Sequence, residues 1–152
     1  MVVEVRRWTI GQVAERAGVA TSALRFYEEH GLITSERNNA GHRRYRPDVA
    51  RRVGFIQVAQ RVGLRLEEVR QVLDTLPKSR TPSRKDWERL AASCRPLLDA
   101  RIAMITALRD QLDSCIGCGC LSLDTCGLYN ADDRAARFGA GPRYLLGDSS
   151  DA

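Results

Sequence analysis

The sequence has few aromatic residues, few histidines and no long apolar run. Aromatic residues make up 6% of the 152 residues, so a single large core is not expected. No segment approaches the roughly 20 apolar residues of a membrane span, and the first eight residues lack the apolar stretch of a signal peptide. The two histidines, His30 and His42, show no catalytic pairing with an acid. We therefore expect a cytoplasmic protein that does not bind a membrane and is not an enzyme.

Positive charge is concentrated in the first half of the chain. Residues 1–76 contain 13 arginines and 9 acidic residues, a net charge of +4, whereas residues 77–152 carry +1. Between residues 37 and 52, six arginines accompany a single acid, Asp48. Such a cluster suits contact with phosphates, because neutralising them releases counterions. A solvated charged face would have the same composition, so charge alone leaves both interpretations open.

Two short helices joined by a tight turn are predicted near the N-terminus. Thr9 and Gln12 have the spacing of a capping box. The helix that they begin should end at Gly18, because glycine readily adopts a left-handed backbone. A second helix should begin at residue 20 or 21 and end at Gly31. This arrangement is the helix-turn-helix pattern.

A basic hairpin and two further helices should follow. Segments 32–34 and 42–45 are candidate strands on either side of Asn-Asn-Ala-Gly at 38–41, which has turn chemistry. The periodicity of apolar residues then predicts a third helix within 47–63 and a fourth over 66–73. A hairpin next to a helix-turn-helix would form a wing.

A long helix is predicted from Ser83, which has Asp86 as its capping-box partner, to about Asp113. Pro96 should kink this helix near residues 92–93 or divide it. The helix carries an apolar stripe with heptad-like spacing, made of Trp87, Ala91, Cys94, Leu98, Ile105, Leu108 and Leu112. Antiparallel pairing with a second copy would bury this stripe; packing against the chain's own small domain is the alternative.

Four cysteines lie within 12 residues, in the pattern C-x2-C-x-C-x5-C, at Cys115, Cys118, Cys120 and Cys126. Thiolates in so short a loop can converge on one metal centre and favour zinc, copper(I) or an iron–sulfur cluster. Zinc sites usually consist of two cysteine pairs separated by a longer loop. Three ligands crowded together therefore favour iron–sulfur and leave zinc open. Cys94 lies on the helical stripe and is expected to be a core residue.

These motifs together resemble the MerR family of transcriptional regulators and, within it, the SoxR-type redox sensors. The MerR part includes Thr9-Ile-Gly-Gln-Val-Ala, Leu24-Arg-Phe-Tyr-Glu and Arg43-Arg-Tyr45. The SoxR-type part is Cys115-Ile-Gly-Cys-Gly-Cys-Leu-Ser with Cys126. The resemblance extends over about residues 8–130.

The resemblance implies a winged helix-turn-helix dimer that binds promoter DNA. A [2Fe–2S] cluster held by the four cysteines would activate transcription when oxidised, by distorting the promoter so that RNA polymerase can use it. The implied DNA-binding residues are Ser22, Arg25 and Tyr27 on the recognition helix and Arg43, Arg44 and Tyr45 in the wing. Phe26 is expected in the core. Trp87 would either shield the cluster or pack in the dimer core.

The predicted fold class is mainly α: a winged helix-turn-helix DNA-binding domain, a long antiparallel dimerisation helix and a C-terminal cysteine-rich cluster loop. The domains are 1–76, DNA-binding; 77–113, linker and dimerisation helix; 114–130, iron–sulfur segment; and 131–152, a partly disordered tail. A zinc-binding or metal-sensing MerR-type regulator is one alternative function. A small iron–sulfur electron carrier is another, disfavoured by the helix-turn-helix, the wing and the basic stretch.

Overall fold

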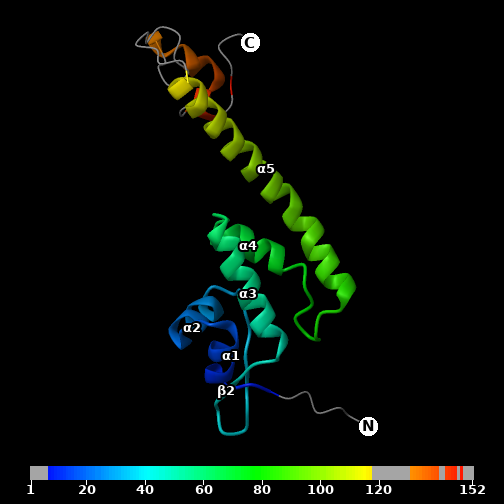
Figure 1. Ribbon diagram of the computed structural model, residues 1–152. Helices are drawn as coiled ribbons and strands as arrows, with labels where there is room; N and C mark the ends of the chain where they lie inside the picture. Colours follow the sequence, from blue (N-terminus) through cyan, green and yellow to red (C-terminus); the bar gives the residue numbers. More distant parts are fainter. Residues whose placement is uncertain (1–6, 118–130, 141–142, 147, 149–152) are drawn as a thin grey trace. The chain divides into compact units, whose positions relative to one another are not determined.

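The computed structural model describes residues 7–117, 131–140, 143–146 and 148. The chain divides into two compact units, residues 1–94 and residues 95–152. Most of the described residues are helical, and the only strands among them form one short hairpin (Figure 1). Within these ranges no helix is both long enough and apolar enough to cross a membrane.

The first two helices form the predicted helix-turn-helix. Helix α1 (Ile10–Ala17) begins with a complete capping box, in which Thr9 Oγ1 accepts the Gln12 N–H at 3.2 Å and Gln12 Oε1 accepts the Thr9 N–H at 2.9 Å. Gly18 ends α1 with a φ of 67°. Helix α2 (Thr21–Glu29) follows, and Gly31, with a φ of 71°, turns the chain away after it. The predicted caps and helix ends are confirmed.

The wing is a hairpin of β1 (Glu36–Arg37) and β2 (Arg43–Arg44), in which Glu36 pairs with Arg44 and Arg37 with Arg43. The first strand was predicted at 32–34, and this prediction was wrong. Leu32 and Ile33 are each 2% exposed and belong to the core. Their apolar side chains are buried after the turn at the end of α2, and strand pairing begins only nearer the hairpin tip.

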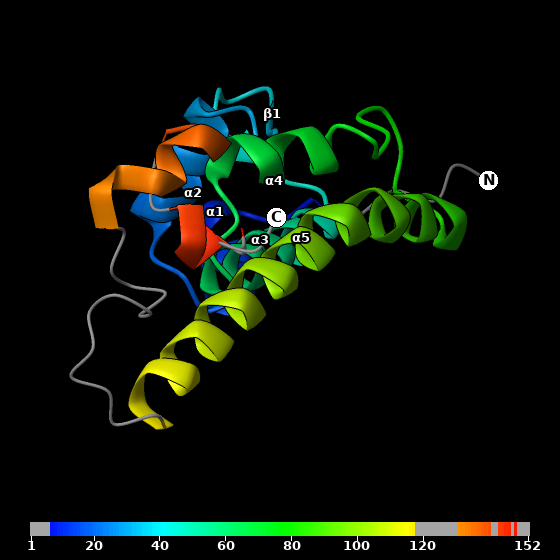
Figure 2. The same ribbon diagram turned by 90° about the horizontal axis from the view of Figure 1, so that it is seen from above.

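Helices α3 (Asp48–Arg61) and α4 (Leu66–Leu73) follow in the N-terminal unit, which extends to residue 94. Helix α3 packs against both α1 and α4, and α1 also packs against α2; Figure 2 shows this group of helices from above. The core of this unit draws on these four helices and on the segments that flank the wing, since the largest fully buried side chains are Val13, Leu24, Ile33, Tyr45, Val53, Ile56 and Val69. The recognition helix and the wing are therefore attached to one apolar core.

Helix α5 (Arg84–Gly117) is the longest element. Its predicted capping box is present, because the Ser83 N–H donates to Asp86 Oδ2 at 2.7 Å and the Asp86 N–H donates to Ser83 Oγ at 3.4 Å. The helix continues through Pro96 and is not divided there. Proline removes the donor to the carbonyl of Ala92, and Ala92 is an exposed residue, so water can satisfy this carbonyl.

Two short 3-10 helices, η1 (Ala131–Phe138) and η2 (Arg143–Leu146), lie in the C-terminal unit and contact each other. They fall in the segment that was predicted to be a partly disordered tail. Of the far end, residues 147–152, only Asp148 is described, and its N–H donates to the Arg143 carbonyl at 3.2 Å.

Candidate nucleic-acid interface and cysteine segment

The outer face of α2 presents the predicted recognition residues Ser22 and Arg25, which are both exposed. Phe26 is 43% exposed on the same helix and stacks on His30, with ring centroids 4.0 Å apart. The prediction that Phe26 is a core residue was wrong. Leu24 and Tyr27, three residues apart, set the buried face of α2, and Phe26 lies about 100° around the helix from Tyr27.

Tyr27 and Tyr45, both predicted to contact DNA, are buried in the structure. Tyr27 is 8% exposed, and its hydroxyl donates to Gln60 Oε1 of α3 at 3.2 Å. Tyr45 is fully buried, and its hydroxyl donates to Glu28 Oε2 at 3.4 Å. Burial, followed by the charge of Glu28, raises the pKa of Tyr45 above its ordinary value. The two rings thus hold the recognition helix and the wing to the core, and little of their surface is exposed.

Arg43 and Arg44 are the two residues of β2, as predicted for the wing. The side chain of Arg43 is 43% exposed, and its Nε lies 2.8 Å from Glu28 Oε2. Arg37, on the facing strand, donates from Nη1 to the Gly41 carbonyl at 2.7 Å and so shapes the hairpin tip. The wing therefore carries three arginines on a short, locally braced hairpin.

Two arginines of the basic stretch have an internal role that the sequence did not reveal. Asp48 accepts from Arg46 Nε at 3.1 Å and from Arg52 Nε at 3.2 Å, and all three side chains are largely buried. Arg52 also donates to the Pro77 carbonyl at 2.8 Å, and Arg46 to the Lys78 carbonyl at 3.3 Å. This pair fastens the linker to the start of α3, so the number of arginines available for phosphates is smaller than the composition suggests.

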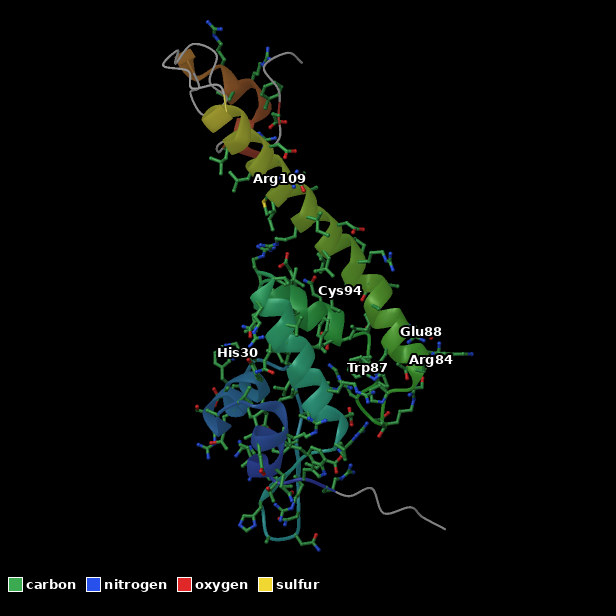
Figure 3. The ribbon with its side chains drawn as sticks, viewed as in Figure 1. His30, Arg84, Trp87, Glu88, Cys94 and Arg109 are labelled. Atoms are coloured by element: carbon green, nitrogen blue, oxygen red, sulfur yellow. The ribbon has the colours of Figure 1, made fainter. Side chains whose placement is uncertain are left out.

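The start of α5 is anchored within the N-terminal unit. The Arg51 guanidinium lies over the Trp87 ring at 5.6 Å from its centroid, a distance suited to a cation–π contact, and Figure 3 shows Trp87 on the side of α5 toward α3. Asp86 is 2% exposed, and hydrogen bonds from Arg80 and then Ser83 hold its pKa well below the usual range. Cys94 is 5% exposed, as expected for a core cysteine, and burial raises the pKa of its thiol.

Beyond Pro96, α5 exposes large apolar side chains. Of the predicted stripe, Ile105 is 58% exposed, Leu108 41% and Leu112 39%. Ile102 is 61% exposed and was missed in the sequence. Its position three residues before Ile105 and four after Leu98 places it on the same face. This stripe has no cover within the described part of the chain.

The cysteine segment begins at the end of α5. Cys115 lies in the last turn of the helix, which ends at Gly117, and nothing is described of its side chain. Cys118, Cys120 and Cys126 lie outside the described residues. The helix thus continues two residues past the first cysteine, beyond the predicted boundary at residue 113.

Comparison with known proteins supports the regulator assignment. The chain matches the models for MerR HTH family regulatory proteins over residues 8–76 and for the MerR DNA-binding region over residues 50–115. It is 54% identical over 142 residues to an HTH-type transcriptional activator SoxR homolog of Chromobacterium violaceum, covering 93% of this chain and 96% of that protein. It is 29% identical over 108 residues to a mercuric resistance operon regulatory protein of Bacillus cereus, covering 70% and 74% of the two chains.

A solved structure supports the same fold. A MerR family protein from Listeria monocytogenes superposes with a TM-score of 0.51 at 28% identity, covering 72% of this chain and 83% of that one. The relatives are transcriptional regulators, which agrees with the prediction that this chain is not an enzyme. The chain belongs to the MerR family of helix-turn-helix regulatory proteins and is of the SoxR type.

Proposed function

We propose that this chain is a cytoplasmic, redox-sensing transcriptional activator. It binds promoter DNA as a homodimer and switches transcription on when a [2Fe–2S] cluster held by its four clustered cysteines is oxidised. The observation that carries this proposal is the cysteine motif at the end of α5, on a chain whose N-terminal unit is a winged helix-turn-helix. A SoxR-type relative that is 54% identical over nearly the whole chain supports it.

DNA contact is assigned to the exposed polar side chains of α2 and the wing. Ser22 and Arg25 face outward from the recognition helix, and Arg43 and Arg44 extend from β2. Arginine reaches both phosphate oxygens and the guanine edge, although phosphate contact is the more common use. Because the rings of Tyr27 and Tyr45 are buried, their proposed part is to hold these arginines in place.

The homodimer is supported by the apolar stripe of α5. Ile102 and Ile105 are more than half exposed, and antiparallel pairing of two copies would remove both from water. Two-fold dimers also match palindromic DNA, whose half-sites lie about one helical turn apart. Promoter distortion by the dimer would act on RNA polymerase indirectly, without a direct contact.

The donor set fits the proposed cluster. Cys115, Cys118, Cys120 and Cys126 provide four thiolates, and Gly117 and Gly119 allow the backbone between them to turn sharply. A bound [2Fe–2S] cluster exchanges one electron and so changes the local charge by one unit. Trp87 is assigned to shielding this region in the dimer or to the dimer core. It is half-buried, with the Arg51 guanidinium over its ring.

The test is anaerobic purification of the full chain, followed by metal analysis and visible spectroscopy. We expect a brown protein that contains iron and sulfide and is bleached by dithionite. Cys126→Ala should lose the colour. Cys94→Ala is the matched control, because Cys94 is buried on α5 away from the motif, and it should keep the colour.

A second candidate function is a zinc-binding or metal-sensing regulator that uses the same thiolates. The similarity to a mercuric resistance operon regulatory protein supports this second candidate, since thiolates are soft ligands that also bind soft metal ions well. A colourless protein with one zinc per chain after anaerobic purification would support this candidate and contradict the redox sensor.

A further inference from the structure

Glu28 occupies a position where a carboxylate is electrostatically unfavourable. It is the penultimate residue of α2, near the negative end of the helix dipole. It also belongs to the helix that we assign to DNA contact, where a negative charge repels phosphates. Its side chain is only 21% exposed, so water compensates for this charge only in part.

The carboxylate is instead satisfied by the wing. Oε2 lies 2.8 Å from Arg43 Nε and accepts from the Tyr45 hydroxyl at 3.4 Å, while Oε1 accepts from the Ser35 hydroxyl. Ser35 precedes β1, Arg43 is in β2, and Tyr45 follows β2. One side chain of the recognition helix therefore holds both sides of the hairpin.

The hairpin depends on such contacts because its own pairing is short. It contains two residue pairs, and an isolated two-stranded hairpin is at best marginally stable in water. The base of the wing is fixed by the backbones of Trp8 and Tyr45, which exchange two hydrogen bonds of 2.8 Å. Arg43 lies closer to the tip, and its side chain remains 43% exposed although its Nε is held by Glu28.

We propose that Glu28 is a positioning residue for DNA binding: it fixes Arg43 and the wing against the recognition helix, so that this partly buried acid raises the affinity for DNA. The inference rests on the proposed function, in which Arg43 contacts phosphate. A flexible arginine loses side-chain freedom when it binds, and an arginine already held by Nε loses less. Glu28 therefore acts through Arg43 and touches no nucleotide.

The opposite expectation comes from charge alone. Removing an acid from a DNA-facing surface reduces repulsion and should tighten binding by up to about twofold at physiological salt. Glu29 provides the matched control, because it is the next residue of α2 and is exposed. Glu28→Gln and Glu29→Gln remove the same charge from neighbouring positions.

The experiment measures binding of the full chain to a mixed-sequence duplex of about 30 base pairs by fluorescence anisotropy. We expect Glu28→Gln to weaken binding about fivefold, since a charge-assisted hydrogen bond is lost, and Glu29→Gln to leave it unchanged or tighten it. In an Arg43→Gln background, Glu28→Gln should leave binding unchanged or tighten it by up to about twofold, because its partner is already absent and only the charge effect remains.

Each result decides the inference. Tighter or unchanged binding by Glu28→Gln would overturn it, and so would the same fivefold loss in the Arg43→Gln background, which would indicate a merely structural role. The Arg43 Nε–H signal in NMR spectra of the DNA-free protein gives a second readout. It should be protected from exchange in the wild type and in Glu29→Gln but not in Glu28→Gln. Equal protection in all three proteins would show that Glu28 does not hold Arg43. If the folded wild type bound neither this duplex nor any sequence selected from a random-sequence pool, the proposed function itself would fail.

Discussion

The exposed stripe of α5 allows the contribution of one side chain, Ile105, to the proposed dimer to be predicted. Ile105 leaves 58% of its surface exposed in the single chain. Complete burial of an isoleucine side chain contributes about 1.5–3 kcal/mol, so covering the exposed share contributes about 1–1.7 kcal/mol. A two-fold dimer contains this site twice. Ile105→Ala should therefore weaken dimerisation by about 2–3 kcal/mol, which raises the dissociation constant roughly 30- to 150-fold.

Sedimentation equilibrium over a range of protein concentrations measures this change directly. Met104→Ala is the control, because Met104 is 42% exposed at the adjacent position, about 100° around the helix from Ile105. It should dimerise like the wild type, and circular dichroism should show the same helicity in all three proteins. Unchanged dimerisation of Ile105→Ala, or an equal loss in Met104→Ala, would refute the assignment of this face to the dimer.

Three further results are expected. Tyr27→Ala should lower the free energy of unfolding by about 3–5 kcal/mol and Phe26→Ala by less than about 1 kcal/mol in urea denaturation, because only Tyr27 is buried; equal losses would contradict the assigned faces of α2. The pKa of Asp86 is lowered, first by Arg80, so its stabilisation is present at neutral pH and lost as pH falls below about 4; Asp86→Asn should be less stable at pH 7 and lose less stability between pH 7 and pH 3. Arg43→Ala should reduce the slope of log affinity against log salt by about 1 for each protomer, or about 2 for the proposed dimer, and an unchanged slope would show that Arg43 does not contact phosphate.

Local signals in the sequence predicted most of the helical framework. The Thr9–Gln12 capping box and Gly18 set the bounds of α1, and the apolar periodicity gave α4 its observed span of 66–73. These features depend on residues three or four positions apart, so they can be recognised from the sequence without knowledge of the tertiary fold. The first wing strand was predicted at the wrong residues because Leu32 and Ile33 are typical of strands. Only the tertiary fold shows that these two side chains are buried in the core.

The candidate DNA interface was only partly predictable for a similar reason. Phe26 and Tyr27 are adjacent aromatic residues, and the choice of which one faces inward depends on the register of α2 against α3 and on Gln60, 33 positions away. The basic stretch contains exposed arginines in the wing and a buried pair, Arg46 and Arg52, bound to Asp48. Which arginines are buried also depends on long-range contacts, here with the carbonyls of residues 77 and 78. The number of arginines in a segment does not show which of them are already paired with an acid of the protein.

The proposed function requires that the oxidation state of the cysteine-bound cluster controls transcription. The direct test is transcription by RNA polymerase in a potential-controlled cell, from a promoter isolated by its binding to the purified dimer, with visible absorption recorded on the same sample. We predict that transcription rises with the oxidised fraction along a one-electron curve, about 59 mV for each tenfold change in ratio, while the protein stays on the DNA throughout. Constant transcription across potentials at which the absorption changes fully would contradict the claim.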